Sequence, residues 1–175
     1  SYLKQHKGYE DLFEGYNEAD LHRGQIEKML RLTVYRDFSK LYRFANVEQR
    51  KFLALYFKRY EVSVIKECLN TVFDHRDVVL NLSIFDEFFN KHSQLDINLL
   101  ASSRTIEELI ANLKGTEYYA PLSQLADIER PTLFDYEMTL DLYYFAQMWK
   151  DRSKVVTKRD LEELTAAWGS KFDML

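Results

Sequence analysis

Glycine and proline are scarce in this sequence, which has 5 glycines and 2 prolines among 175 residues. The tight turns of sheet proteins draw on these two residues, so a β-protein of this length would need more of them. No segment alternates apolar and polar residues over a sustained run, and no Asn-Gly or Asp-Gly hairpin signal occurs. The shortage therefore favours an all-α fold of antiparallel helices.

Cysteine, membrane-spanning runs and a signal-peptide pattern are also lacking. The lone cysteine, Cys68, excludes an intramolecular disulfide framework and fits a reducing compartment. No apolar run approaches the ~18 residues that a membrane span needs. A net charge of −4 argues against general nucleic-acid binding, which depends on clustered cations. We expect a soluble, cytosolic chain, and both ends suggest a piece of a longer protein.

Sequence motifs for catalysis and for phosphate binding are absent. Neither G-x-x-x-x-G-K-[ST], G-x-G-x-x-G, H-E-x-x-H nor C-x-x-C occurs. The best ligand-like cluster is His75 between Asp74 and Asp77, a pattern that also suits an ordinary capped helix start. Cys68, on an apolar stripe, is expected to be an inert core thiol. We expect no catalytic residue, no cofactor, no metal and no ATP binding.

The most informative segment is FLALYFKRYEVSVIKECL at 52–69. A capping box formed by Asn46 and Gln49 opens a helix predicted over 47–69. At helical spacing one face carries an apolar stripe that belongs in a core: Leu53, Tyr56, Phe57, Tyr60, Val64 and Cys68. Leu55 and Leu69 lie among the charged residues instead, so this helix is expected to pack on more than one side.

Further helices are predicted along the chain from apolar spacing and from start and stop signals. They cover 18–32, 36–44, 76–92, a stretch from a capping box at Thr105 to a stop at Gly115, an amphipathic stretch after Pro131, and 157–168. In the stretch after Pro131, the amphipathic pattern comprises Leu133, Tyr136, Leu140, Tyr143, Tyr144 and Gln147. Short loops are predicted at 93–98, 119–122 and 127–131.

Cations on the 47–69 helix provide the candidate contact residues for a partner, namely Lys58, Arg59 and Lys66. The alternative is a solvated face on which these cations make local ion pairs with Glu61, on the flank of the helix, or Glu67. Lys58 and Arg59 are expected to face solvent in either case. The pair Tyr118-Tyr119 is either an exposed aromatic anchor or a lid over a helix end.

Several of these segments resemble a known family. The 52–69 segment looks like a long helix of the C subunit of bacterial and archaeal V/A-type ATP synthases, which corresponds to the d subunit of eukaryotic V-ATPases. The family resemblance extends to two further segments, RTIEEL at 104–109 and LKGTEYY at 113–119. It also includes five later residues: Glu137, Leu140, Asp141, Tyr143 and Tyr144. The resemblance covers most of 24–175, and the residues before Gly24 depart most from it.

The resemblance implies an all-helical, funnel-shaped protein with threefold pseudosymmetry and no active site. It sits on the cytoplasmic face of the proteolipid ring and receives the rotor shaft, so these are the implied partners, without nucleic acid or small-molecule substrate. Within one continuous helical body, 1–104 would hold a first unit and the start of a second, 105–168 the remainder, and 169–175 the start of a third. The competing classes are a generic helical adaptor and a helical-bundle enzyme with buried carboxylates.

Overall fold

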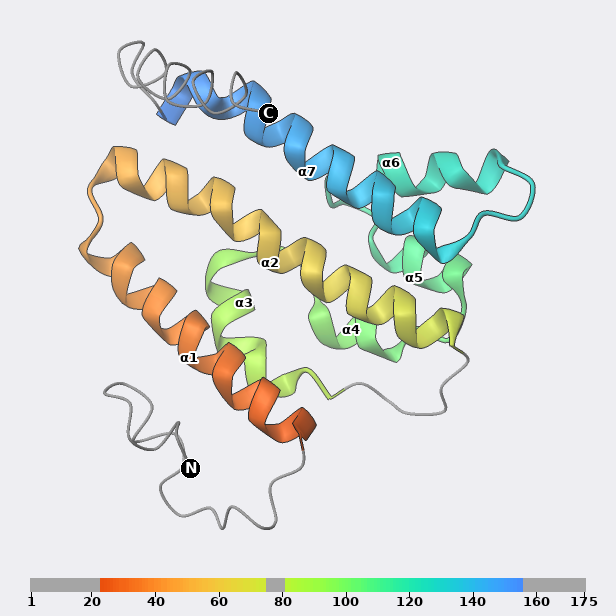
Figure 1. Cartoon of the computed structure of the whole chain (residues 1–175), viewed down its shortest axis with the longest axis horizontal. Coiled ribbons are helices and arrows are strands. Elements are labelled where there is room, and N and C mark those ends of the chain that lie inside the picture. The colour runs from red at the N-terminus through yellow and green to blue at the C-terminus, as the bar shows by residue number, and fades with distance from the viewer. Residues whose placement is uncertain (1–22, 75–80, 156–175) are drawn as a thin grey trace, which may run out of the picture. The chain divides into compact units, whose positions relative to one another are not determined.

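The computed structural model describes residues 23–74 and 81–155, and every regular element within these two ranges is a helix (Figure 1). The predicted all-α fold is thereby confirmed. The chain divides into two units, Ser1–Ala45 and Asn46–Leu175. The predicted boundaries near residues 104 and 168 separate repeated units of sequence, which differ from these two compact units, and they stay predictions.

The described part of the first unit is one helix, α1, from Arg23 to Phe44. The predicted break between helices at 32 and 36 is wrong, because the helix runs through this stretch without interruption. Thr33, in the predicted gap, remains within the helix, and its hydroxyl donates to the Met29 carbonyl at 3.2 Å. Residues 18–22 of the predicted helix lie outside the described residues.

The second unit begins with α2, Val47–Phe73, whose 27 residues make it the longest described helix. The predicted capping box is present: Gln49 N donates to Asn46 Oδ1 and Asn46 N donates to Gln49 Oε1, both at 2.9 Å. The helix continues four residues beyond its predicted end at 69. Asn70 supports this extension, since its side-chain amide donates to the Lys66 carbonyl at 2.8 Å.

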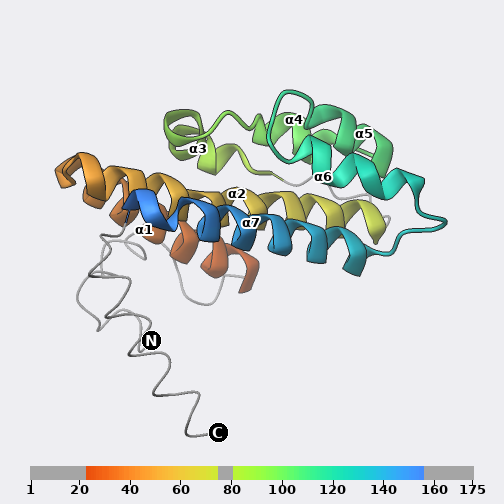
Figure 2. The same ribbon diagram turned by 90° about the horizontal axis from the view of Figure 1, so that it is seen from above.

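The last described helix, α7, runs from Leu133 to Val155. Thr132 caps it: its own N–H and hydroxyl donate to Asp135 Oδ2 at 2.7 Å, and Asp135 N donates to Thr132 Oγ1 at 3.3 Å. Sequence reasoning found this helix but not its cap. In two perpendicular views α7 lies beside α2, and Figure 2 shows the shorter helices on one side of this pair.

Between α2 and α7 the chain folds into short helices that complete the second unit. These are η4 (Ser83–Phe85), α3 (Asp86–His92), α4 (Ile97–Ser102), α5 (Ile106–Asn112), α6 (Tyr119–Ser123) and η5 (Gln124–Asp127). The predicted cap of α5 is present, because Glu108 N donates to Thr105 Oγ1 at 3.2 Å. The predicted stop is also present, since Gly115 has a φ of 88°, which favours glycine.

Two predictions for these short segments are wrong. The helix predicted over 76–92 is interrupted, because Asn81 Oδ1 accepts hydrogen bonds from the backbone N–H and the hydroxyl of Ser83 in a local turn. Residues 75–80 of the predicted helix lie outside the described residues. The predicted loop at 119–122 is the helix α6. Pro121 is the third residue of α6, where its missing N–H removes no intrahelical bond.

The core of the second unit is built around aromatic rings. Phe57 of α2 lies 5.1 Å and 5.6 Å, centroid to centroid, from Phe88 and Phe89 of α3. Of the predicted stripe, Phe57, Val64 and Cys68 are buried, whereas Leu53, Tyr56 and Tyr60 are half-buried. Leu55 and Leu69 are buried as well, which confirms that α2 packs on more than one side.

Candidate functional site

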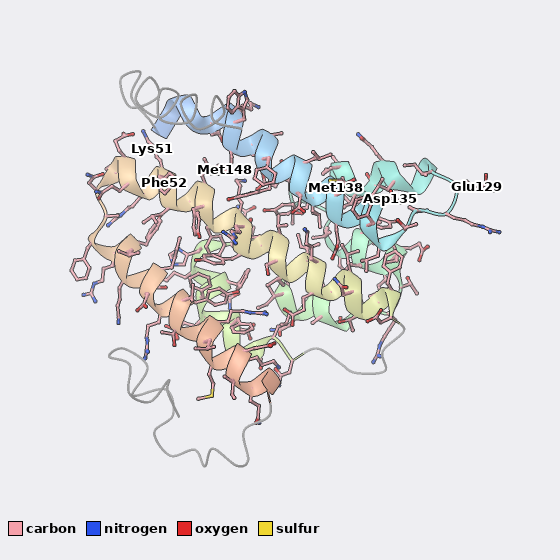
Figure 3. All side chains as sticks on the ribbon, viewed as in Figure 1. Lys51, Phe52, Glu129, Asp135, Met138 and Met148 are labelled. Atoms are coloured by element: carbon pink, nitrogen blue, oxygen red, sulfur yellow. The ribbon has the colours of Figure 1, made fainter. Side chains whose placement is uncertain are left out.

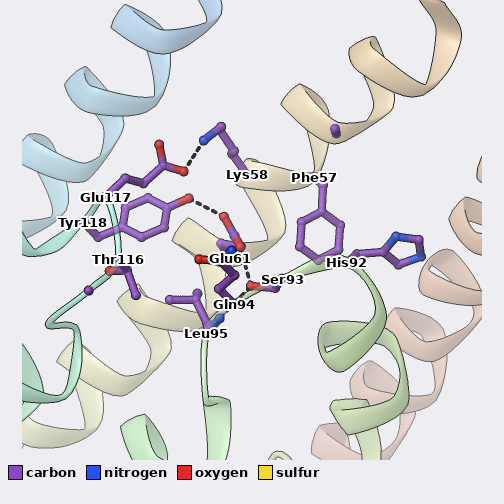
Figure 4. A pocket seen from close by; sticks show the side chains of 12 residues that line it. Phe57, Lys58, Glu61, His92, Ser93, Gln94, Leu95, Thr116, Glu117 and Tyr118 are labelled. Carbon is purple, nitrogen blue, oxygen red and sulfur yellow. Dashed lines mark hydrogen bonds and ion pairs between the residues drawn. The ribbon is translucent and has the colours of Figure 1, made fainter. Parts of the chain in front are cut away.

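A recess of about 390 Å³ lies where α2 meets two connecting segments (Figure 4). One wall is α2, another is the segment 93–95 after α3, and the third is the turn 115–118 after α5. The geometry depends on local turn chemistry, because the positive φ at Gly115 lets the chain reverse and bring Tyr118 toward α2. Polar and aromatic side chains from all three segments therefore meet in one place.

A buried carboxylate, that of Glu61, lines this recess and is 8% exposed. Its Oε2 accepts a hydrogen bond from the Tyr118 hydroxyl at 2.6 Å, and its Oε1 accepts one from the Ser93 hydroxyl. The expectation that Glu61, on the flank of the helix, would pair with the cations of a solvated face is therefore wrong. The error arose because the residues that cover Glu61 are 32 and 57 positions away in sequence.

Burial shifts the protonation equilibria of this cluster. Desolvation raises the pKa of Glu61, and the hydrogen bonds from Ser93 and Tyr118 oppose that rise. Desolvation also raises the pKa of Tyr118, with a further contribution from the negative charge of Glu61. The tyrosine consequently remains a hydroxyl donor, and the pair forms a fixed link between α2 and the turn after α5.

A second carboxylate of the recess, that of Glu117, binds one polar group from α2 and one from α7. Lys58 forms an ion pair with Glu117 Oε1, and the Tyr143 hydroxyl of α7 donates to Glu117 Oε2 at 2.9 Å. Burial, followed by the bond to Glu117, raises the pKa of Tyr143 to about 12. Lys58 is thus tied to a residue 59 positions away instead of to Glu61 or Glu67.

The other two candidate contact residues, Lys66 and Arg59, differ in burial: Lys66 is half-buried and Arg59 is exposed. The ammonium of Lys66 lies 2.7 Å from Asp141 Oδ2 on α7, which again replaces the predicted local pair by a distant one. Arg59 is exposed, as predicted, whereas Lys58 is half-buried. One helical turn from Lys66, the Asn70 amide donates to Glu137 of α7 at 2.9 Å. The two cross-links show that α2 and α7 are antiparallel, because the residue numbers rise on one helix and fall on the other.

The Lys66–Asp141 pair is expected to contribute modestly to stability. The two side chains are 24% and 43% exposed, so solvent screens much of their attraction. A double-mutant cycle with Lys66→Met and Asp141→Asn should give a coupling free energy of about 1 kcal/mol or less in urea unfolding, falling as salt is added. A coupling several times larger, or insensitive to salt, would contradict this expectation.

The remaining candidates from the sequence are resolved only in part. Cys68 is buried and desolvation raises its pKa to about 12, as suits a core thiol. Tyr118 is buried and Tyr119 half-buried, so the pair is no exposed anchor. His75 and Asp77 lie outside the described residues. Across 23–74 and 81–155, no group of three or more His, Cys, Asp or Glu is placed to hold a metal ion.

One outward row of large apolar side chains on α7 was not singled out from the sequence. Its members are Phe134, Met138 (Figure 3), Leu142, Phe145 and Trp149, with exposed fractions from 37% to 68%. The predicted inward pattern of the same helix is confirmed at Tyr136 and Leu140, which are buried. Large apolar side chains exposed along one row of a helix are a feature of interaction sites. No helix in the described part of the chain is long and apolar enough to cross a membrane.

Comparisons with known proteins identify the family. No solved structure matches the chain. The C subunit of the A-type ATP synthase of Methanosarcina mazei is 30% identical over an alignment of 152 residues that covers 83% of this chain. The matched part is 39% of that relative, so the chain spans well under half of its length. The family described as ATP synthase (C/AC39) subunit matches residues 1–175, and the chain therefore belongs to this family of ATP synthase C subunits.

Proposed function

We propose that the chain is part of a non-catalytic coupling subunit in the central stalk of a V/A-type ATP synthase. In this role it links the rotor shaft to the proteolipid ring on the cytoplasmic side of the membrane, and supports rotary proton or sodium transport. The observation that carries the proposal is the family match over the whole chain. The relative from Methanosarcina mazei, itself the C subunit of an A-type ATP synthase, supports it.

The packing of the second unit suits a part that transmits torque. A coupling element must resist bending, and close-packed helices with many buried aromatic rings are stiff. Here α2 and α7 are long, antiparallel helices joined by Lys66–Asp141 and Asn70–Glu137. The turn after α5 joins the same pair, because Glu117 binds Lys58 of α2 and Tyr143 of α7.

Partner contacts are proposed at the cations of α2. Arg59 is the strongest candidate, because its side chain is exposed, whereas those of Lys58 and Lys66 are half-buried. Lys58 and Lys66 each bind a carboxylate already, so a partner would have to share them. Exposed charges at an interface act mainly on the association rate and its salt dependence.

Co-purification tests the coupling role directly. The chain, or the longer protein that contains it, is co-expressed with the shaft proteins and the proteolipid ring of its own complex, and we expect it to elute with one or both. Arg59→Glu should weaken this association in a salt-dependent way. Arg36→Glu, at an exposed position of α1, is the matched control. Elution with neither shaft nor ring would contradict the proposal.

Calorimetric titration with Mg-ATP tests the non-catalytic part of the proposal. The sequence has no phosphate-cradling loop, so no saturable heat is expected. Tight, saturable binding would contradict a purely mechanical role while leaving the family assignment intact.

A further inference from the structure

The charges around the recess of α2 are unbalanced. Glu61 and Glu117 are both carboxylates of its lining, and Lys58 is the lysine that lines it with them. Lys58 forms its ion pair with Glu117, whereas the hydrogen bonds that Glu61 accepts within the described residues come from two neutral hydroxyls. The charge of Lys58 also lowers the pKa of Glu61, but by less than either hydroxyl does, so the two carboxylates share the charge of one lysine.

The recess has room beside this carboxylate. Its volume of about 390 Å³ falls within the range of small-molecule sites in proteins. Phe57 and Tyr118 contribute aromatic side chains to its lining, and Figure 4 shows Glu61 between them. Phe57 and Tyr118 are only 3% and 2% exposed, so these rings form a packed wall, and the carboxylate supplies the charged hydrogen-bond acceptor that an organic cation requires. The lining thus combines an apolar wall with a charged acceptor, an arrangement that suits a guanidinium or an ammonium group.

We propose that this recess binds an organic cation, a guanidinium or primary ammonium group, against Glu61. The cation has two sources, a basic side chain of a partner protein or a free small molecule such as a polyamine, and both use the same chemistry. Glu61 accepts hydrogen bonds from the bound cation in addition to those from Ser93 and Tyr118. The site does not depend on the proposed coupling role.

A charged and an uncharged version of one small probe test the site on the unmodified protein. Nα-acetyl-arginine amide is titrated into the 15N-labelled chain, with Nα-acetyl-citrulline amide as the neutral match of nearly the same shape. We expect saturable shifts of the backbone amide signals near Glu61, Ser93 and Tyr118 with the arginine probe. Binding of the citrulline probe should be about tenfold weaker or absent, since it lacks the charge-assisted bonds. No saturable shift, or equal binding of both probes, overturns the proposal.

Three variants separate the roles of the charges. Glu61→Gln should weaken the arginine probe about tenfold, whereas Glu48→Gln, an exposed glutamate on the same helix, should leave it unchanged. Lys58→Met should tighten binding, because it removes the cation that competes for the carboxylates. Equal effects of the two glutamine variants, or weaker binding in Lys58→Met, would contradict the site. If Glu61→Gln fails to fold, the probe pair and Lys58→Met still decide the question.

The source of the cation is distinguished in the complex. The arginine probe is titrated into the protein bound to its co-purifying partners. If a partner side chain occupies the recess, the complex no longer binds the probe. If the natural ligand is a free cation, the complex binds the probe as the isolated chain does. Both results support the site and assign its ligand, provided that the isolated chain distinguishes arginine from citrulline.

Discussion

Replacement of Phe57 by alanine is expected to lower the free energy of unfolding by about 3–5 kcal/mol, the usual cost of truncating a core aromatic. Phe57 is 3% exposed, and its ring lies within 6 Å of four other rings, those of Tyr60, Phe88, Phe89 and His92. Truncation would leave a cavity between α2 and α3 that these rigid rings cannot fill. Urea unfolding followed by circular dichroism measures the loss.

The matched control is Phe52, which is on the same helix but 44% exposed. Phe52→Ala removes the same atoms from a site that water already reaches, so we expect a cost well below that of Phe57→Ala. Equal losses for the two variants would show that the cost reflects helix propensity instead of core packing. If Phe57→Ala left the free energy of unfolding unchanged, α2 would have to present a different face to α3.

Features that depend on neighbours within one or two helical turns could be predicted from the sequence. Asn46 and Gln49 specify the start of α2, and Thr105 with Glu108 specifies the start of α5. The apolar spacing of α2 places Phe57, Val64 and Cys68 in the core. These predictions succeed because caps and amphipathic faces follow from the period of the helix alone.

Features that depend on the conformation of short connections could not be predicted in this way. Pro121 signalled a loop, but at the third position of α6 its missing N–H removes no bond. Asn81 gave no signal as a break, although its side chain closes the turn before η4. In each case the local sequence permits more than one backbone conformation, and the packing around it selects one.

The candidate site was the least predictable feature, because its contacts are all between distant residues. Lys58 and Lys66 have glutamates nearby in sequence, and local ion pairs were a reasonable expectation. Their actual partners, Glu117 and Asp141, come from elements that only the tertiary fold brings to α2. The one local hint was that Val62, Val64 and Ile65 follow Glu61, an apolar run that favours burial of this stretch of the helix.

Glu61→Ala is expected to destabilise the protein by about 2–4 kcal/mol, since the change leaves two hydroxyl groups without their acceptor and creates a void. Ser93 and Tyr118 both donate to Glu61, so the segment after α3 and the turn after α5 would each lose a hydrogen bond to α2. Glu48→Ala, at an exposed position of α2, is the control and should cost less than about 1 kcal/mol. Similar losses at both positions would contradict a structural role for the buried carboxylate.

A comparison of the wild type with Glu61→Gln isolates the contribution of this carboxylate to the pH dependence of the free energy of unfolding. Burial raises the folded-state pKa of Glu61 above its ordinary value of 4.5, so the folded protein binds this proton more tightly than the unfolded chain does. The ionised form therefore costs stability, and the cost grows as the pH rises past the unfolded pKa and is complete above the folded one. Glutamine cannot ionise, and its amide can still donate to one hydroxyl and accept from the other.

The stability of the wild type relative to Glu61→Gln should consequently fall as the pH rises from about 4 to about 8. Paired urea titrations across this range measure the difference, in which the titration of all other groups largely cancels. A difference that stays constant, or that grows in favour of the wild type, would show that hydrogen bonds from Ser93 and Tyr118 outweigh desolvation and hold Glu61 ionised.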